Sequence, residues 1–375
     1  MPTRLLPLLL PGATAAIRSN MTARCTLLTL ASIAALPFAL SCASCAHPGP
    51  REAKTQALAR VRVYVSNERS GDISVIDAAS NQVVATIPVG KRPRGIHLSR
   101  NGRTVYVALS GSPIAGPNVR DEDLPPADKK ADGIGAVDVA SGRFVEKIAS
   151  GSDPEQFTLT PDERYLYVSN EDEARASVLD LRSRKVVASL KVGTEPEGVA
   201  ISPDGRLVYI TSETTNDVHV IDTATRTIVA NFKTAQRPRS VGFLPDGSKA
   251  YVTCETAGVV CVVDVPANMV TKEIHPPGEG QRPMGIVVAP GGRRAYVTTG
   301  RGGAVVAIDT ASDEVVATIP GVGARPWGIG ITPDGKTLYT ANGPSDDVSV
   351  IDTATMKVVA RVNAGASPWG IAIVQ

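Results

Sequence analysis

The sequence predicts an all-β protein, a β-propeller of seven blades with four antiparallel strands in each blade. Three observations lead to this prediction. A block of about forty residues recurs along the chain, each block reads as four short strands, and no useful helical periodicity follows residue 60. A period of roughly 40–45 residues built from four short strands is typical of a propeller blade.

Two residue types mark each block. A tyrosine opens the second strand and an aspartate closes the third, and in six of the seven blocks they are 13 residues apart. The tyrosines are Tyr64, Tyr106, Tyr167, Tyr209, Tyr251, Tyr296 and Tyr339. The aspartates are Asp77, Asp138, Asp180, Asp222, Asp264, Asp309 and Asp352. Tyr106 and Asp138 are 32 residues apart, so this block carries a 19-residue insertion within 111–133.

The first block shows how the strands are read. Residues 61–66, 72–76 and 83–87 alternate between apolar and polar side chains, as half-buried strands do, and 95–98 follows as a fourth strand. The blocks begin on a second strand and end, at 370–374, on a first strand. The C-terminal strand is therefore expected to join the N-terminal blade and close the ring, which leaves no frayed edge.

Most of the repeated letters are explained by turns. Pro-Asp-Gly at 203–205, 245–247 and 333–335 is a tight-turn sequence. Asp222 and Asp352 can accept hydrogen bonds from their own turn amides. Because the seven aspartates lie in different outer hairpins, they are not expected to form a metal or acid–base site.

Composition limits the function classes. The chain has 375 residues, 43% of them hydrophobic, with 34 Gly and 28 Pro, which suits many short strands joined by turns. The formal charge is +2, and it becomes −1 (36 basic against 37 acidic residues) without the first 45 residues. Such a balance gives no argument for binding nucleic acid or an anionic membrane.

Residues 1–45 are expected to be a signal peptide, and 46–60 a polar tether ahead of a propeller domain at 61–375. Met21 begins a more standard signal than Met1, since Arg24 precedes an apolar run at 27–40 that is too short to span a bilayer. The sequence around Cys42 resembles a bacterial lipobox, in which that cysteine would be lipidated. Ordinary cleavage after Ala43 or Ala46 is the alternative. The protein is thus expected to be exported, either to the periplasm or as an outer-membrane or cell-surface lipoprotein.

Cysteines and histidines give no metal or haem site. Cys254 and Cys261 lie on neighbouring strands of one hairpin, either as buried thiols or as the disulfide that export would permit. No Cys-x-x-Cys-His motif is present, and the four histidines are scattered, whereas a metal site needs clustered ligands. We predict no metal and no cofactor.

The motifs YVSN, VSVID-ATxxVVATIPVG and RPxGIxxSPDG resemble the YVTN family of β-propeller repeats. The resemblance covers Val61–Gln375. It implies an exported bacterial or archaeal protein with a seven-bladed ring and a binding or structural role. Related seven-bladed rings include lactonases, a lyase that opens cyclic peptide antibiotics, and the cofactor-holding domains of quinoprotein and haem-type nitrite reductases. Fold alone does not choose among these functions.

An x-Pro-x motif precedes the first strand of each blade, and its flanking residues vary. The loop that carries it and the loop between second and third strands are expected on the same face, around the mouth of the central channel. The candidate ligand-binding residues there are Arg92, Arg94, Glu155, Glu195, Glu197, Arg237, Arg239, Arg282, Arg325, Trp327 and Trp369. Arginine pairs bidentately with carboxylate or phosphate, and the tryptophans offer an apolar face. The alternative is that the charges neutralise each other across the mouth while the tryptophans pack between blades.

These observations favour a monomeric, non-catalytic binding module for an unknown protein or a small polar ligand, with the membrane touched only through a lipid anchor. The insertion at 111–133 is expected to be a long loop over or beside the mouth. The first alternative is a lactonase-like hydrolase or lyase that uses mouth carboxylates such as Glu195 and Glu213. The others are a cofactor-holding propeller, or a nucleic-acid-binding one, which the charge balance disfavours.

Overall fold

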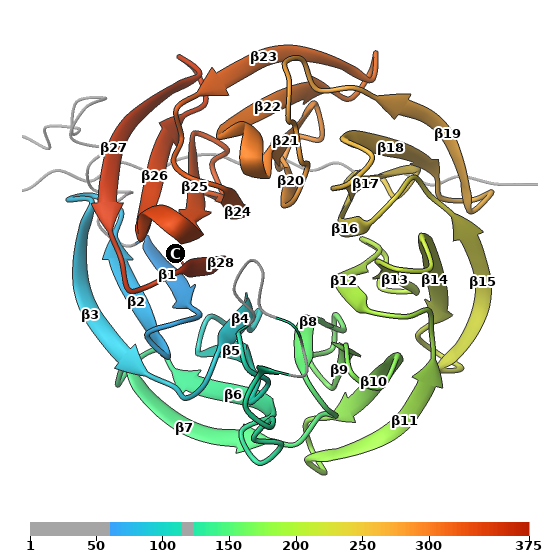
Figure 1. The fold of residues 1–375 in the computed structure, drawn as a ribbon. Coiled ribbons are helices and arrows are strands. Elements are labelled where there is room, and N and C mark those ends of the chain that lie inside the picture. The colour runs from blue at the N-terminus through green and yellow to red at the C-terminus, as the bar shows by residue number, and fades with distance from the viewer. Residues whose placement is uncertain (1–60, 115–119, 121–122, 375) are drawn as a thin grey trace, which may run out of the picture. The chain divides into compact units, whose positions relative to one another are not determined.

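The computed structural model describes residues 61–114, 120 and 123–374. The seven sheets of these residues, each of four antiparallel strands, are arranged in a ring around a central channel, with one strand of every sheet lining it (Figure 1). The predicted seven-bladed β-propeller is confirmed. The expected signal peptide, Met21, Cys42 and the tether at 46–60 lie outside the described residues.

We number the blades from the N-terminus and give their strands from the channel outward. Blade 1 contains β28 (Pro368–Val374), β1 (Arg62–Asn67), β2 (Asp72–Asp77) and β3 (Gln82–Pro88). Blade 2 contains β4 (Pro93–Leu98), β5 (Thr104–Leu109), β6 (Gly133–Asp138) and β7 (Arg143–Ile148). Blade 3 contains β8 (Pro154–Leu159), β9 (Tyr165–Asn170), β10 (Arg175–Asp180) and β11 (Lys185–Lys191).

Blades 4 and 5 contain β12 (Pro196–Ile201), β13 (Leu207–Ser212), β14 (Asp217–Asp222) and β15 (Thr227–Lys233); and β16 (Pro238–Phe243), β17 (Lys249–Cys254), β18 (Val259–Asp264) and β19 (Met269–Ile274). Blades 6 and 7 contain β20 (Ile286–Val288), β21 (Arg294–Thr298), β22 (Ala304–Asp309) and β23 (Glu314–Pro320); and β24 (Pro326–Ile331), β25 (Thr337–Asn342), β26 (Asp347–Asp352) and β27 (Lys357–Asn363).

The ring closes as predicted, because the last strand completes the first blade. β28 pairs antiparallel with β1, with Arg62 opposite Val374 and Ser66 opposite Gly370. Blade 1 therefore joins the two ends of the described chain, and separating them would expose a strand edge.

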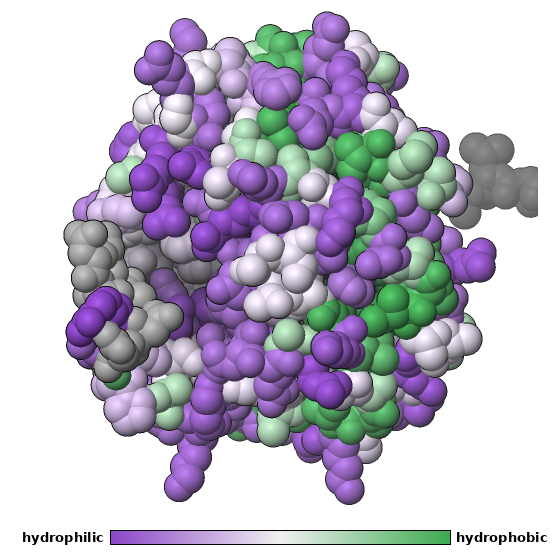
Figure 2. All heavy atoms as spheres, turned by 45° about the vertical axis from the view of Figure 1, so that its right-hand side comes forward, coloured by the Kyte–Doolittle hydropathy of each residue, from purple (hydrophilic) through white to green (hydrophobic). Residues whose placement is uncertain are grey.

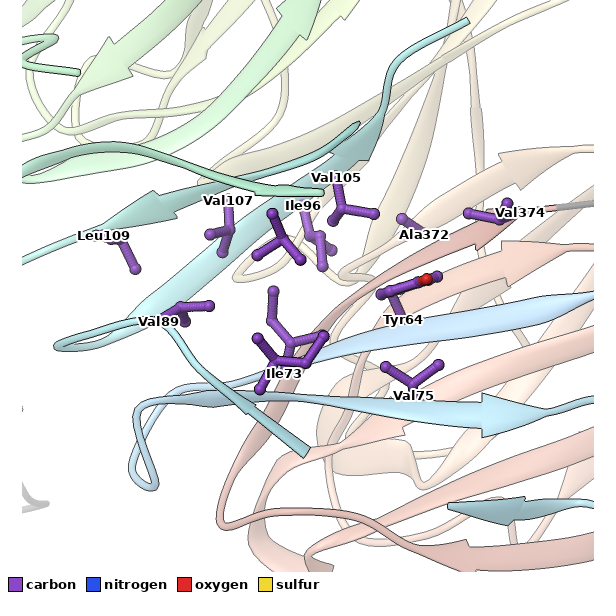
Figure 3. Packing of buried hydrophobic residues seen from close by; sticks show 12 residues of the cluster. Tyr64, Ile73, Val75, Val89, Ile96, Val105, Val107, Leu109, Ala372 and Val374 are labelled. Atoms are coloured by element: carbon purple, nitrogen blue, oxygen red, sulfur yellow. The ribbon is translucent and has the colours of Figure 1, made fainter. Parts of the chain in front are cut away.

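The hydrophobic core is divided among the seven contacts between neighbouring blades. Each cluster of buried side chains draws on two adjacent blades; the one shown in Figure 3 packs Ile73 and Val75 of blade 1 against Ile96, Val105 and Val107 of blade 2. Because every blade buries both faces in this way, the strands inside it are almost continuously apolar.

The repeated tyrosines connect neighbouring blades. In three blades the hydroxyl reaches the outer turn of the next blade: Tyr167 donates to the carbonyl of Thr223 (3.4 Å), Tyr209 to Oδ1 of Asn268 (2.8 Å) and Tyr251 to Oδ1 of Asp313 (2.5 Å). A tyrosine at this position therefore combines core packing with an interblade hydrogen bond.

The turns form as their residues predict. In blade 4, Asp204 accepts hydrogen bonds from the Ser202 hydroxyl (2.6 Å) and the Arg206 amide (3.1 Å), while Gly205 has a φ of 75°. Asp222 accepts from the amide (2.8 Å) and hydroxyl (2.9 Å) of Thr225. The aspartates that close the third strands thus stabilise local turns, as expected.

The outermost strands each contain a bulge that the alternation rule does not predict. In blade 1, Val75 lies opposite Ala85 and Ile76 opposite Val83, so Val84 has no partner and is 53% exposed. The same shift occurs in every blade and leaves one extra residue on the rim. A bulge on an edge strand obstructs pairing with another chain. In Figure 2, which brings the rim near β15 and β19 forward, hydrophobic groups are interspersed with hydrophilic ones.

Candidate functional site

The candidate site is the mouth of the channel, where two kinds of loop meet. The loops that carry the x-Pro-x motifs and those between second and third strands lie on one face, as predicted. Arg92, from an x-Pro-x motif, binds Oε1 of Glu68, from a second-to-third-strand loop, through Nε (3.0 Å) and Nη2 (2.9 Å). The two loop sets therefore exchange charged contacts.

In six blades, the residue before the motif proline has a left-handed backbone. Its φ lies between 41° and 61°, a region that residues with a Cβ rarely adopt. These residues are Arg92, Asp153, Glu195, Arg237, Arg325 and Ser367. In blade 6 the turn differs, and the Arg282 and Met284 amides instead donate to the Thr299 and Thr298 carbonyls (3.0 Å each). The sequence does not predict this strained turn, because a residue before proline is usually extended.

The residue after the proline is held by the preceding blade. Ser66 donates to the Arg94 carbonyl (2.6 Å), Thr211 to that of Arg239 (3.1 Å) and Thr298 to that of Trp327 (2.8 Å). These hydroxyls fix the backbone from which the mouth side chains project, so the site is built on a rigid frame.

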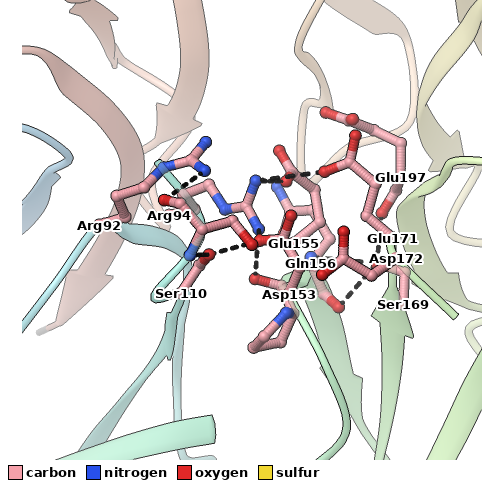
Figure 4. Close-up of polar contacts among 12 residues, drawn as sticks. Arg92, Arg94, Ser110, Asp153, Glu155, Gln156, Ser169, Glu171, Asp172 and Glu197 are labelled. Carbon is pink, nitrogen blue, oxygen red and sulfur yellow. Dashed lines mark hydrogen bonds and ion pairs between the residues drawn. The ribbon is translucent and has the colours of Figure 1, made fainter. Parts of the chain in front are cut away.

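Arg94 is the centre of the acidic side of the mouth. Its side chain is 2% exposed, forms ion pairs with Asp153 and Glu155, and lies 3.5 Å from Oε2 of Glu171 (Figure 4). Burial alone would raise the pKa of Asp153, but Arg94 and the hydrogen bond from Ser110 outweigh it and hold that pKa below its usual value. One buried guanidinium thus forms ion pairs with three carboxylates.

Glu171 differs from the other mouth carboxylates. Burial raises its pKa to about 7, Arg94 opposes the shift, and the neighbouring Glu197 and Asp153 carboxylates add to it. Its only ion pair among the described residues is the 3.5 Å contact with Arg94. A carboxyl group with a pKa near neutral can accept or donate a proton at physiological pH.

A second ion-pair network joins blades 4 and 5. Arg239, whose side chain is 6% exposed, contacts Glu213 and lies 3.1 Å from Oε1 of Glu197 and 3.8 Å from Oε2 of Glu255. Arg237 pairs with Glu213 (2.7 Å) and Glu255 (3.1 Å). The acidic and basic side chains therefore neutralise each other over this part of the mouth, as in the alternative to ligand binding given by the sequence.

The side formed by blades 6, 7 and 1 is less completely paired. Arg325 reaches over blade 6 to Glu255, but the contact is long (3.7 Å), and the buried Nε atom of Arg325 has no hydrogen-bond partner within the described chain. Its guanidinium carbon lies 4.7 Å from the centre of the Trp327 ring. Burial lowers the pKa of Arg325, Glu255 opposes this, and the nearby Arg239 and Arg301 lower it further. Arg325 is thus a cation with surplus positive charge around it.

The asymmetry has a cause in the sequence. In blades 1, 3, 4 and 5, the residue after the second strand is a glutamate; these are Glu68, Glu171, Glu213 and Glu255. Blades 6 and 7 have Thr299 and Gly343 there, followed by the short 3-10 helices η2 (Gly300–Gly302) and η3 (Gly343–Ser345). Without a carboxylate at this position in blades 6 and 7, the 3.7 Å contact with Glu255 is the one ion pair of Arg325 in the described chain.

A cavity of about 590 Å³ opens on this side of the mouth. Its lining includes Arg325, Trp327, Arg69, Asp346 and Ser367. A cavity of this size is in the range that holds small ligands. Aromatic and cationic groups line it together, which suits an anion that carries an apolar group.

The two tryptophans occupy different environments. Their ring centres are 5.9 Å apart, but Trp369 is only 4% exposed, whereas Trp327 is half-buried and lines the cavity. The expected apolar face is therefore supplied by Trp327. Both residues follow the motif proline, so sequence analysis could not distinguish them.

The remaining predicted site residues are dispersed. Glu195 accepts a hydrogen bond from Thr214, beside a separate cavity of about 220 Å³. Arg282 is half-buried and has no ion pair with any residue that the structure describes. Asp153 and Arg69 are not among the predicted site residues, although Asp153 lies in a variable x-Pro-x motif and Arg69 in a loop between second and third strands.

The insertion lies between β5 and β6, and its described ends are fixed beside the mouth. The Gly111 amide donates to Asp132 (2.7 Å), Arg92 donates to the carbonyls of Ser112 (3.0 Å) and Pro113 (3.3 Å), and Lys91 pairs with Asp128 (2.8 Å). The described ends of the insertion therefore lie beside the mouth, next to blade 2.

Other candidate features carry less chemistry. The channel below the mouth contains a cavity of about 150 Å³ lined in part by His97, whose pKa burial lowers to about 4. Cys254 and Cys261 are buried free thiols. In the described ranges, no three His, Cys, Asp or Glu side chains form a group that could hold a metal ion, and no helix is long and apolar enough to cross a membrane.

The fold and the mouth thus define a seven-bladed β-propeller with a charged channel mouth. Solved structures agree with the fold. A hydrazine synthase chain from Kuenenia stuttgartiensis is 23% identical, with a TM-score of 0.62 over 75% of this chain and 89% of that one. A Bacteroides fragilis protein described as a candidate 6-phosphogluconolactonase is 16% identical, with a TM-score of 0.69 over 88% of this chain and 100% of that one. A Desulfotomaculum acetoxidans protein of unknown function is 17% identical, with a TM-score of 0.68 over 84% and 99%.

Sequence comparisons cover less of the chain. The family model described as the choice-of-anchor I domain matches residues 53–234, just under half of the sequence. Antigen Lp49 from Leptospira interrogans is 28% identical over 109 residues, which are 29% of this chain and 23% of the antigen. The matched segment therefore spans about a quarter of that relative. Neither match tests the finer expectation of the YVTN family, which stays a prediction.

Proposed function

We propose that this protein is an exported, monomeric binding module whose ligand is an anion with a flat apolar group, held in the mouth cavity that Arg325 and Trp327 line together. One observation carries the proposal. Arg325 lines a cavity of about 590 Å³ with its Nε atom unpartnered among the described residues and its nearest carboxylate 3.7 Å away. A bound carboxylate or phosphate would supply the missing acceptors.

The contrast within the mouth supports this location. The buried guanidiniums of Arg94 and Arg239 each contact three carboxylates, so a ligand anion would have to displace an existing partner there. Arg325 offers a cation that is already partly desolvated but poorly paired. A charged hydrogen bond gained at such a site contributes about 1.5–3 kcal/mol.

Export rests on the N-terminal sequence, with its basic start and short apolar run. The description of the matching family model as a choice-of-anchor domain and the name of the leptospiral antigen agree with a surface location. We propose lipidation at Cys42 as the anchor, and the YVTN family as the repeat type.

The chain contains its own reporter for the proposed site. Its two tryptophans, Trp327 and Trp369, both lie at the mouth, so selectively excited tryptophan fluorescence reports on this region alone. We expect phenyl phosphate to change the emission saturably, and phenol or inorganic phosphate to bind more weakly, since each supplies half of the recognition.

Arg325→Gln should weaken phenyl phosphate binding by about tenfold or more, because a charged hydrogen bond is lost. Arg103→Gln is the matched control, since Arg103 is exposed on the first-to-second-strand turn of blade 2 and has no ion pair in the described chain. Equal weakening in the two variants, or no saturable signal in the wild type, would refute the proposal.

A second candidate is a hydrolase or lyase in which Glu171 acts as the general base. The observation that favours it is the pKa of Glu171, which burial raises to about 7. Lactone and ester substrates would be screened with wild type and Glu171→Gln. Turnover that the variant abolishes would support catalysis, and absence of turnover across the panel would leave binding as the function.

A further inference from the structure

The mouth cavity adjoins a second cavity along blades 1 and 2. The second has a volume of about 500 Å³ and shares Glu68, Arg69 and Ile114 with the first. Each cavity has the size of a small-ligand site by itself. Because these three residues line both cavities, the two lie side by side, and we call them together the groove, which extends from Trp327 to the insertion.

The two ends of the groove differ in chemistry. The mouth end has Arg325 and Trp327, and the far end has an apolar wall that includes Pro125 and Pro126 of the insertion. A compact ligand would fill one end only. An elongated ligand with charged and apolar groups would use both.

The charges along the groove favour an acidic occupant. Glu68 is neutralised by Arg92 (2.9 Å) and Asp128 by Lys91 (2.8 Å). The Asp346 carboxylate accepts a hydrogen bond from the Ser367 amide (2.7 Å). Arg69, in contrast, is exposed at the junction and has no ion pair with the residues described.

The junction is held in place by backbone contacts across blade 1. The amides of Glu68 and Arg69 donate to the carbonyls of Ser367 (2.9 Å) and Ala366 (3.1 Å). Arg69 therefore projects from a fixed loop at the point where the two cavities meet, with Arg325 as the other underpaired cation of the groove.

From these observations we infer that the groove binds an extended acidic peptide segment of a partner protein. This inference rests on the proposed function, since the mouth end of the groove is the proposed anion site. An acidic side chain of the peptide would bind Arg325, a second would bind Arg69, and an apolar side chain would pack against Pro125 and Pro126. The apolar wall favours a peptide over an acidic oligosaccharide, which has no comparable side chain to place there.

The test uses two probes on the purified full-length protein, followed by tryptophan emission. They are phenyl phosphate, which fills the mouth end only, and the tryptophan-free peptide acetyl-GEFEELEG-amide. We expect the peptide to bind at least about tenfold more tightly than phenyl phosphate, and the lysine analogue acetyl-GKFKKLKG-amide not to bind. Peptide affinity should fall with added salt.

Arg69→Gln separates this inference from the proposed function. It should weaken the peptide about tenfold while changing phenyl phosphate binding less than twofold, and Arg103→Gln should change neither. If phenyl phosphate binds but the peptide gains nothing and ignores Arg69→Gln, the groove inference is wrong and the mouth site stands. If neither probe binds, both are wrong. Tighter binding of tetragalacturonate than of the peptide would also overturn the peptide assignment.

Discussion

Replacing Arg94 by methionine should destabilise the propeller strongly. The side chain is 2% exposed and contacts Asp153, Glu155 and Glu171, so the substitution leaves three carboxylates without their shared cation. Breaking a buried ion pair by removing one partner costs about 3–5 kcal/mol. At about 2 °C per kcal/mol for a domain of this size, Tm should fall by about 6–10 °C.

The matched variant is Arg325→Met, whose target has one ion pair of 3.7 Å and a side chain that is 36% exposed. A pair of that kind contributes at most about 1 kcal/mol, so Tm should fall by about 2 °C or less. Both variants would be followed by thermal and denaturant unfolding. The Arg94→Met penalty should also shrink at pH 5 relative to pH 8, because the orphaned carboxylates can then become protonated. Equal Tm values for the two variants would refute the division of the mouth into paired and underpaired sides.

Four further predictions concern the stability of the ring and the attachment of the protein to membranes. Deleting 367–375 should lower the free energy of unfolding by more than the roughly 3–5 kcal/mol expected for losing Trp369 alone, because β1 also loses its partner strand. A denaturation curve close to that of the wild type would contradict ring closure. Tyr251→Phe should cost about 1.5–3 kcal/mol through the lost hydrogen bond to Asp313, whereas Tyr296→Phe, whose hydroxyl has no partner in the described chain, should cost less than about 0.5 kcal/mol. Burial lowers the pKa of His97 to about 4, so between about pH 6.5 and pH 4 the unfolded chain binds a proton that the folded chain does not. This residue therefore makes the free energy of unfolding fall as pH falls through that window. His97→Gln should flatten the fall, and an unchanged pH profile would show that His97 becomes protonated in the fold. If Cys42 is lipidated, Cys42→Ser should release the protein from membranes on fractionation, and unchanged membrane association would count against the anchor.

Much of the fold could be predicted from the sequence because it repeats. The seven tyrosine and aspartate positions predicted the number of blades, and the longer spacing in the second block predicted the inserted loop. The final strand, which has no further strands after it in its block, predicted the ring closure. The bulges were not predicted, although the sequence contains an indication of them, because two consecutive apolar residues such as Val83 and Val84 break the alternation of an outer strand.

The candidate site was less predictable, because its chemistry depends on distances between blades. Sequence alone could place Arg94 and Arg325 at equivalent faces of the ring. It could not show that Arg94 forms ion pairs with three carboxylates, whereas Arg325 reaches over blade 6 to a single glutamate. The left-handed residue before each proline and the burial of Trp369 also follow from packing between innermost strands.

The most direct test of the proposed site is to locate a bound anion in a crystal. A crystal soaked with 4-bromophenyl phosphate would show the ligand through the anomalous signal of bromine. We predict a peak beside Trp327, with the phosphate within hydrogen-bond distance of Arg325. A peak beside Arg94, or none at concentrations that saturate the fluorescence change, would contradict the assignment of the mouth site.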